Sequence, residues 1–351
     1  MRNTADIVIA GRYVLREILG AGGMGVVYRA VDLEHGDDVA LKILRRRHSS
    51  NAGATQRFLA EAEVGGRVRH PNVVAVHDSG TAADGAPFLV MELVRGQLLD
   101  KLVERAGELP LQRVAAIVGQ LLAGLEALHA AGLVHGDVKT GNILVAPCED
   151  GDAVKLIDLG LARAPDSADA APARMASGTP EYMAPEVIRG EPAQPVSDLY
   201  AAGTVLYQLL TGATPFEGGT SREILRRHLD DEVVPPSLRC PDRGIPLALE
   251  RAVMSALAKD PAARYPTARA FAEALAAATP LVEPPACPAP RRPVLSASSP
   301  TNQWTVHELP LPRRLGRGTR RSAAAPYDCE RDGVAELAAK PTLPQRAVRS
   351  S

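Results

Sequence analysis

The chain has 351 residues, of which 46% are hydrophobic and only 3% aromatic, so it can bury a core made mostly of Ala, Val and Leu. A formal net charge of -1 gives no global reason to expect nucleic acid or an anionic membrane as a partner. The four cysteines lie far apart with no CxxC pair, which argues against a zinc site and a disulfide framework and favours free thiols in a reducing cytoplasm.

The N-terminal stretch "MRNTADIVIAGRYVL" has too short an apolar run for a secretory signal. A membrane helix needs about 18 apolar residues, and the nearest stretch, Val114 to Val134, is broken by Gln120, Glu126 and His129. We therefore expect a soluble, cytoplasmic protein without a membrane segment or a sensor domain.

The pattern of apolar residues predicts two lobes after an N-terminal extension at residues 1–11. Residues 12–93 contain five short runs typical of strands, with one helical stretch near Thr55 to Val68; the runs are "YVLREIL", "VVYRAVD", "VALKIL", "VVAVHD" and "PFLVMEL". Residues 94–279 are dominated by long Ala/Leu-rich helices, expected at Leu111 to Ala131, Ser197 to Leu210, Leu247 to Ala258 and Thr267 to Ala277. The fold class expected is α+β, with a small β-rich lobe followed by a larger helical lobe.

Composition changes after about Thr279. Residues 280–351 are rich in Pro, Arg, Ser and Ala, with 11 Arg plus Lys against 6 Asp plus Glu. Because this segment shows little helical or strand periodicity, we predict a disordered tail, and a solvated extension is a better interpretation than a docking segment.

The first motif with chemical meaning is "LGAGGMGVVY", in which Gly20, Gly22 and Gly25 have a GxGxxG spacing. Glycines let backbone N–H groups approach phosphate oxygens without a Cβ in the way. A dinucleotide site needs a helix after such a loop, whereas Val26 to Asp32 continues as a β-run. An ordinary glycine-rich hairpin remains the alternative on this motif alone.

A lysine follows in the next predicted strand. Lys42 ends "VALK", and Glu61 on the helix of the small lobe is its expected partner. Glu63 is the rival, but residues two apart on a helix point about 200° away from each other, so only one can face Lys42. On its own, a lysine in a strand is more often a solvent-facing residue.

The stretch "GLVHGDVKTGNILV" supplies groups for phosphoryl transfer. Asp137 can orient or deprotonate a hydroxyl, Lys139 can neutralise charge on the transferred group, and Asn142 can offer an amide oxygen to Mg²⁺. Asp158 in "VKLIDLG" ends an apolar β-run, where its carboxylate can hold Mg²⁺ on the phosphates. A lone Asp-Leu-Gly is a common turn, so this prediction depends on the order of the motifs.

From about Tyr13 to Ala277 the chain resembles bacterial members of the eukaryotic-type (Hanks-type) serine/threonine protein kinases. The ordered set comprises the glycine-rich loop, "VALK", "HPNVV", "LVHGDVKTGNILV", "IDLG", "GTPEYMAPE", "SDLYAAG" and "KDPAARY". The resemblance implies a two-lobed fold with ATP between the lobes, Mg²⁺ as cofactor, transfer to Ser or Thr of proteins including the chain itself, and a possible homodimer through the small lobe.

The resemblance also implies roles for individual residues. Asp137 and Lys139 would be catalytic, and Asn142 and Asp158 would hold the metal. The ATP site would be formed by Leu19, Gly20, Ala21, Gly22, Gly23, Met24, Gly25, Val27, Ala40, Lys42, Glu61, Met91, Glu92, Val94 and Leu144.

Four residues outside the ATP site resemble residues with structural roles in this family. Glu186 would pair with Arg264 in the interior and fix the region that receives the substrate, and Asp198 would anchor the catalytic loop from a central helix. Thr179 resembles the family threonine that bonds to the catalytic Asp and Lys.

The chain departs from the family pattern at three positions. Gly136 stands where most members have the Arg that binds an activation-segment phosphate, so we expect weaker dependence on such a phosphate. The segment from Asp158 to Glu186 offers only Ser167, Ser177 and Thr179 as hydroxyl acceptors. Leu159 replaces a Phe and Thr140 a frequent Pro, with little expected effect on the chemistry.

Two other functions compete with a protein kinase. "HGD" with a downstream Asn also occurs in aminoglycoside and choline kinases, but these lack Lys139 and the "GTPEYMAPE" segment. A pseudokinase scaffold usually loses equivalents of Lys42, Asp137 or Asp158, and all three are present here.

Overall fold

A computed structural model describes residues 7–22, 25–44, 66, 68–149, 151–158 and 179–279. The chain divides into two units, Met1–Cys287 and Pro288–Ser351, and the described residues all belong to the first. The helix expected near Thr55 to Val68 and the tail expected at 280–351 lie outside the described residues, apart from Gly66 and Val68.

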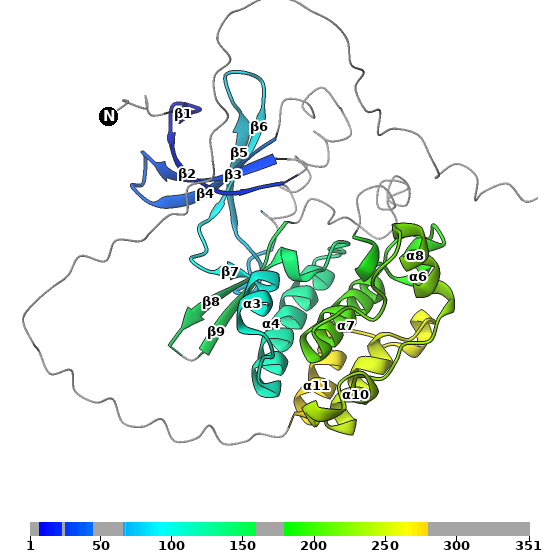
Figure 1. The fold of residues 1–351 in the computed structure, drawn as a ribbon. Helices are drawn as coiled ribbons and strands as arrows, with labels where there is room; N and C mark the ends of the chain where they lie inside the picture. The colour runs from blue at the N-terminus through cyan, green and yellow to red at the C-terminus, as the bar shows by residue number, and fades with distance from the viewer. Residues whose placement is uncertain are drawn as a thin grey trace, which may run out of the picture. The chain divides into compact units, whose positions relative to one another are not determined.

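The N-terminal part is an antiparallel sheet of six strands in the order β1-β2-β3-β4-β6-β5 (Figure 1). The strands are β1 (Val8–Ile9), β2 (Tyr13–Ala21), β3 (Gly25–Asp32), β4 (Asp38–Leu44), β5 (Val76–Thr81) and β6 (Pro87–Glu92). The five runs predicted as strands correspond to β2 through β6, so this part of the prediction is confirmed.

Both faces of this sheet carry apolar side chains, because successive residues of a strand point to opposite sides. On one face Leu41, Phe88 and Val90 belong to a cluster with Tyr13. On the other face Ala40, Leu89 and Met91 form a cluster with Leu44 and Val74. The second cluster lies on the side where the sequence predicts the adenine base.

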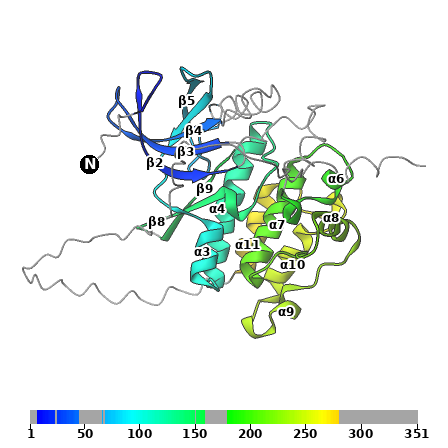
Figure 2. The same ribbon diagram turned by 45° about the horizontal axis from the view of Figure 1, so that its top comes forward.

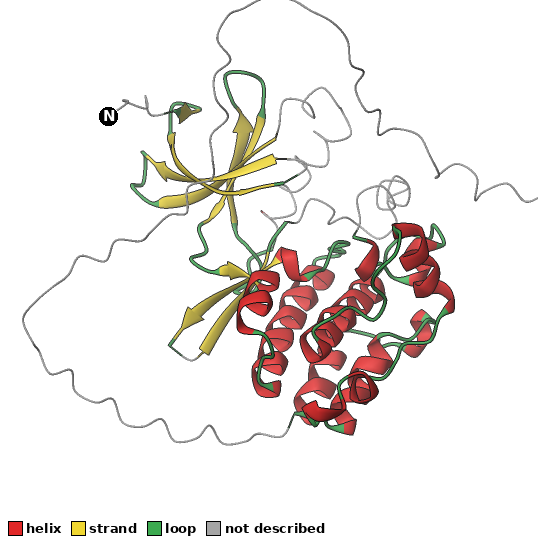
Figure 3. Ribbon diagram, viewed as in Figure 1, coloured by secondary structure: helices red, strands yellow, loops and turns green. Residues whose placement is uncertain are grey.

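A second, three-stranded antiparallel sheet follows in the order β7-β8-β9 (Figure 3). Its strands are β7 (Gln97–Leu98), β8 (Ile143–Cys148) and β9 (Gly151–Leu156). Asn142 directly precedes β8 and Asp158 follows β9 by two residues, so this small sheet brings the two predicted metal ligands together. The sequence indicated the β-run before Asp158 but did not predict β7 or β8.

Helices make up most of the rest (Figures 1 and 2). They are α3 (Leu99–Ala106), α4 (Leu111–Ala130), α6 (Pro185–Ile188), α7 (Pro195–Thr211), α8 (Ser221–Asp230), α9 (Pro236–Arg239), α10 (Leu247–Ala256) and α11 (Ala268–Ala278). The 3-10 turns are η1 (Thr140–Asn142), η3 (Pro180–Tyr182), η4 (Pro241–Arg243) and η5 (Pro261–Ala263). The four long helices expected from the sequence match α4, α7, α10 and α11 to within two residues at each end, and α+β is the observed class.

The core of the helical part is centred on α7, which packs against α4, α10 and α11. Its residues from Ser197 to Tyr207 are all buried, including polar Asp198 and Thr204. Pro195 begins the helix and Gly212, with φ of 80°, ends it in a left-handed cap. A helix buried on every side is a rigid support for the loops that contact it.

By length and mean hydropathy α4 is the one helix among the described residues that is apolar enough to cross a membrane. The polar residues that we took to interrupt this stretch therefore do not disqualify it by composition. In the structure its Val114, Ile117, Leu121 and Leu125 are buried in the core with α7 and α11, which is the usual situation of a core helix.

Candidate active site

The glycine-rich loop joins β2 to β3. A Cβ added at Gly20 or Gly22 would meet nothing within 4 Å, whereas one at Gly25 would lie 2.7 Å from the Ile43 carbonyl oxygen. The close approach of β4 therefore requires a glycine at position 25. Gly20 and Gly22 leave their backbone accessible, as binding of a phosphate to backbone N–H groups requires. The Gly22 N–H donates to the Gly25 carbonyl at 3.0 Å and closes the turn. Gly23 and Met24 lie outside the described residues.

Lys42 of β4 reaches Asp158 beyond β9. Its Nζ donates to Asp158 Oδ1 at 2.9 Å, although the two residues are 116 positions apart. Burial by itself would raise the pKa of Asp158, but the charge and hydrogen bond of Lys42 outweigh it and the pKa is lowered. Asp158 is held as a carboxylate in a left-handed backbone conformation with φ of 62°. Glu61, the predicted partner of Lys42, lies outside the described residues.

The catalytic loop brings Asp137, Lys139 and Thr179 together. Lys139 Nζ donates to Asp137 Oδ2 at 2.6 Å and to Thr179 Oγ1 at 2.9 Å. The predicted bond between the "GTPEY" threonine and the catalytic lysine is therefore present. Lys139 connects the carboxylate to the start of Thr179–Glu186, the segment that we call the substrate platform.

Asn142 is oriented by the same carboxylate. Its Nδ2 donates to the Asp137 backbone carbonyl at 2.8 Å and to Asp137 Oδ2 at 2.9 Å. Since both amide hydrogens are directed to Asp137, the amide oxygen is the atom left for a metal. An amide oxygen and the Asp158 carboxylate are hard oxygen donors of the kind that Mg²⁺ prefers, so the residues present fit this ion.

Asp198 of α7 holds the catalytic loop from below. Its carboxylate accepts the backbone N–H groups of His135 and Gly136, both at 2.8 Å, and lies 2.9 Å from His129 Nε2. Although burial alone would raise the pKa of Asp198, these donors lower it. Gly136 has φ of 77°, a left-handed conformation that suits glycine. The predicted anchoring of the loop by Asp198 is present, whereas His129 was not predicted.

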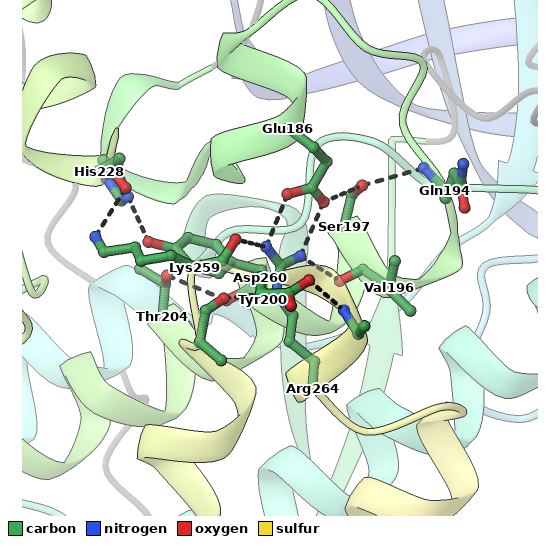
Figure 4. A network of polar contacts seen from close by, with 12 residues as sticks. Glu186, Gln194, Val196, Ser197, Tyr200, Thr204, His228, Lys259, Asp260 and Arg264 are labelled. Carbon is green, nitrogen blue, oxygen red and sulfur yellow. Dashed lines mark hydrogen bonds and ion pairs between the residues drawn. The ribbon is translucent and has the colours of Figure 1, made fainter. Parts of the chain in front are cut away.

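The substrate platform is fixed at its other end by a buried ion pair (Figure 4). Glu186 and Arg264, 3% and 5% exposed, form the predicted pair through two hydrogen bonds of 2.8 and 2.7 Å. Ser197 of α7 also donates to Glu186 at 2.7 Å, and Arg264 donates to the carbonyls of Ala258 and Val196. The pair thus joins the platform, α7 and the loop before α11.

A buried histidine lies beside this pair (Figure 4). His228 of α8 has Nδ1 2.7 Å from the Tyr200 hydroxyl, and burial, followed by the nearby Lys259, lowers its pKa to about 3. His228 is therefore neutral. Lys259 Nζ donates to the His228 backbone carbonyl at 2.8 Å and lies over the Phe216 ring. Lys259 and Phe216 therefore support α8 beside the platform.

The expected adenine side of the site is apolar. Ala40 of β4 pairs with Met91 of β6, and Val27 of β3 pairs with Lys42, which places these residues on adjoining strands. Leu144 of β8 is partly buried and Leu19 of β2 is exposed.

Glu92, the last residue of β6, is hydrogen-bonded to Ala75 and Lys155. Its N–H donates to the Ala75 carbonyl at 3.0 Å, and its carboxylate accepts from Ala75 N–H and from Lys155 Nζ. The Glu92 N–H is therefore occupied, which leaves its carbonyl for a ligand. Val94 follows two residues later.

Sequence reasoning missed two residues, one that contacts the catalytic loop and one that joins α4 to β9. Tyr182 bonds to both Thr140 and Gln208, and Asn72 of "HPNVV" bonds to Gln120 and the Val154 carbonyl. A signal existed for each, since both residues lie inside motifs that were recognised as wholes.

A glycine-rich hairpin, a strand lysine bonded to an aspartate, and a loop with Asp, Lys and Asn together define a protein kinase. The protein kinase domain model matches residues 13–274, and the chain belongs to this family.

Individual relatives are serine/threonine-protein kinases by name. The chain is 40% identical over 331 residues to serine/threonine-protein kinase pkn3 of Myxococcus xanthus, covering 93% of this chain and 58% of that protein. It is 38% identical over 281 residues to PknA of Mycobacterium tuberculosis, covering 79% of this chain and 63% of that protein. The chain thus spans about three fifths of the length of these relatives.

Among solved structures, the PknI kinase domain of Mycobacterium tuberculosis is similar with a TM-score of 0.61 and 28% identity. The similarity covers 79% of this chain and 99% of that domain.

Proposed function

We propose that this chain is an ATP- and Mg²⁺-dependent serine/threonine kinase that phosphorylates proteins, itself among them. The observation that carries the proposal is the Asp137 carboxylate, held by Lys139 and Asn142, with Lys139 bonded to the substrate platform. A pseudokinase would not need a catalytic base that is connected through Lys139 to the substrate platform. A small-molecule kinase would not need the platform.

Each residue has a defined task in this proposal. Mg·ATP supplies the phosphoryl group, its metal held by Asn142 Oδ1 and the Asp158 carboxylate and its phosphates by Lys42 and the glycine-rich loop. The Glu92 carbonyl and the Val94 N–H bind the adenine edge. Asp137 accepts the hydroxyl proton of the acceptor, and Lys139 stabilises charge on the transferred group.

Transfer of labelled γ-phosphate from Mg·ATP tests the proposal. The acceptors are the protein itself, a generic basic protein and an aminoglycoside, with phosphosites located by mass spectrometry. Label is expected on Ser or Thr, and Asp137→Asn is expected to lose about 10²- to 10⁴-fold in rate. Asp230→Asn, at an exposed end of α8, is the matched control and keeps the wild-type rate. Transfer to the aminoglycoside alone would favour a small-molecule kinase. ATP binding without any transfer would favour a pseudokinase scaffold.

We also propose that the N-terminal sheet forms a homodimer. Ile7, Val8 and Leu33 are 62%, 45% and 59% exposed. They lie at one end of the sheet, because Val8 pairs with Val14 and the Leu33 N–H donates to the Arg12 carbonyl. Grouped exposed apolar residues at an edge strand are typical of an interface.

Sedimentation equilibrium distinguishes this dimer from a monomer. Leu33→Asp is expected to shift the protein toward the monomer, and Leu238→Asp, at a residue 72% exposed on α9, to leave the association unchanged. Equal behaviour of both variants, or a wild type that is monomeric at every concentration, would contradict the proposal.

We further propose a cytoplasmic location with neither nucleic acid nor membrane as a partner. The net charge of -1 and the free Cys148 and Cys240 support it. Recovery of the full chain in the membrane fraction after cell lysis would argue against it.

A further inference from the structure

The substrate platform touches the catalytic loop at a second point, through Thr140, Tyr182 and Gln208. The Tyr182 hydroxyl donates to Gln208 Oε1 at 2.6 Å, and Thr140 Oγ1 lies 3.1 Å from the same hydroxyl. A phenol has one hydrogen, and here it is directed to Gln208. The Thr140 hydroxyl is therefore the donor to the Tyr182 oxygen.

These three residues come from three separate segments. Thr140 begins η1, between the lysine and the asparagine of the catalytic loop; Tyr182 ends η3 on the platform; and Gln208 lies on the buried helix α7. Thr140 is 3% exposed. Burial raises the pKa of Tyr182 more than the hydrogen bonds of Tyr182 lower it, so the Tyr182 phenol keeps its hydrogen at neutral pH. Because the contact is largely screened from water, its geometry is well defined.

The Thr140 contact complements the bond from Lys139 to Thr179. Lys139 holds the platform at Thr179, and Thr140 holds it three residues later at Tyr182. Two adjacent residues of the loop thus fix both ends of Thr179–Tyr182 relative to Asp137. A side chain without a hydrogen-bond donor at position 140 could not make this contact with the Tyr182 hydroxyl.

We propose that Thr140 is a positioning residue that holds the substrate platform in register with Asp137 through Tyr182. The inference rests on the proposed kinase function, because its effect falls on the protein acceptor. ATP binding and ATP hydrolysis without an acceptor do not depend on this contact, since neither uses the platform.

Steady-state kinetics with a Ser-containing peptide, preceded by thermal unfolding to confirm folding, test the role. Thr140→Val keeps the shape and removes the hydroxyl, and is expected to lower kcat/KM for the peptide by about 3- to 10-fold with KM for ATP unchanged. Thr140→Ser restores the wild-type value.

Two further variants sharpen the test. Thr204→Val removes another fully buried hydroxyl, whose bond goes to the Tyr200 carbonyl at 3.2 Å, and is expected to keep the wild-type kcat/KM. Thr140→Val combined with Tyr182→Phe should be no worse than Tyr182→Phe alone, because both act through one contact.

The outcomes separate this inference from the proposed function. A wild-type protein that phosphorylates the peptide, with Thr140→Val unchanged, would overturn the positioning role alone. Equal losses of ATP hydrolysis and peptide transfer in Thr140→Val would also overturn it, since the effect would then not be confined to the acceptor. A wild-type protein with no transfer at all would overturn the proposed function and this role with it.

Discussion

At the scale of single residues, Glu186 and Asp158 each have a pKa that a basic partner lowers. Glu186 is buried and would have a raised pKa if alone, but Arg264 and Ser197 lower it. The Asp158 side chain is 47% exposed, and the charge and hydrogen bond of Lys42 lower its pKa. Each acid therefore depends on a particular partner, and the two partners have different tasks, since one supports the platform and the other faces the phosphates.

Removing the charge of Glu186 tests the buried pair. Glu186→Gln leaves the Arg264 guanidinium buried without a counter-charge and is expected to reduce the free energy of unfolding by about 3 to 5 kcal/mol at pH 7. Urea unfolding measures it. Arg269→Ala, which breaks the exposed Arg269–Glu273 pair of α11, is the control and should change stability by less than about 1 kcal/mol.

The pH dependence of this pair has a defined sign. The pKa of Glu186 is lower in the folded state than in the unfolded state, where it is about 4.3. The ionised carboxylate therefore adds to the free energy of unfolding above about pH 4.3, and this stabilisation is lost as the pH falls through the folded-state pKa. The stability difference between wild type and Glu186→Gln should therefore narrow below about pH 4. A constant difference across this range would show that the pair does not act through charge.

Lys42→Ala tests the second acid. Lys42 is the group that lowers the pKa of Asp158 most, and desolvation raises it. Without the ammonium group the pKa of Asp158 should therefore rise. A titration of the Asp158 carboxyl carbon by NMR measures it. Lys101→Ala removes a lysine paired with Glu104 on α3 and should leave the Asp158 pKa where it is; an equal shift in both variants would contradict the assignment.

At the scale of elements, α4 carries two glycines in different surroundings. A Cβ at Gly124 would lie 2.8 Å from the Asn72 carbonyl oxygen, whereas one at Gly119 would meet nothing within 4 Å. Gly124 thus permits the close approach of the "HPNVV" turn, and Gly119 has no such reason in its contacts.

The two glycines should respond in opposite directions. Gly124→Ala is expected to reduce the free energy of unfolding by about 1 to 3 kcal/mol, because the backbone of Asn72 must shift. Gly119→Ala is expected to increase it by about 0.5 to 1 kcal/mol, because alanine is the better helix former. Chemical denaturation of both variants, at constant m-value, provides the measurement, and losses of equal size would refute the argument from space.

The elements also show what the sequence could predict. The strands β2 to β6 and the helices α4, α7, α10 and α11 were predictable, because their apolar periodicity is strong. Helix α8 was missed because "SREILRRHLD" is largely polar, although Thr220 and Glu223 form a capping box that signals its start. Strand β7 has too few residues for a pattern, and β8 contains a proline, which weakens the strand signal.

The motifs allowed some contacts to be predicted, such as Thr179 with Lys139 and Glu186 with Arg264, but not others. Order and spacing of the motifs indicated Asp137, Lys139, Asn142 and Asp158. The bonds from Lys42 to Asp158 and from Tyr182 to Gln208 join residues distant in the chain, and spacing along the sequence carries no information about such distances. They arise from the packing of β4, the platform and α7.

At the scale of the whole molecule, we predict that the tail at residues 280–351 adds little to the stability of the described part. The large core cluster extends to Ala278 in α11. Deleting residues 280–351 is therefore expected to change the free energy of unfolding by no more than about 0.5 kcal/mol. Unfolding of the truncated and full chains gives the comparison. A changed rate of phosphate transfer or a lost partner would assign the tail a regulatory role, and a large loss of stability would show that it contributes to the core.

The second prediction at this scale concerns activation. Since Gly136 has no side chain to bind a phosphate, phosphatase treatment is expected to leave most of the transfer rate of the wild type. Gly136→Arg should make the rate fall further on the same treatment. Initial rates before and after dephosphorylation decide it, and a wild type that loses its activity would indicate a phosphate-binding group elsewhere.

The way in which Asp198 binds the loop has an evolutionary consequence. Its carboxylate holds the backbone N–H groups of His135 and Gly136, so these bonds use no side-chain atom of position 136. A non-glycine residue at position 136 reduces stability by about 1 to 2 kcal/mol because of the left-handed backbone conformation. It does not remove the hydrogen bonds from the backbone to Asp198. A single codon change at position 136 is therefore expected to add or remove dependence on a bound phosphate without breaking the bonds from Asp198 to the loop backbone.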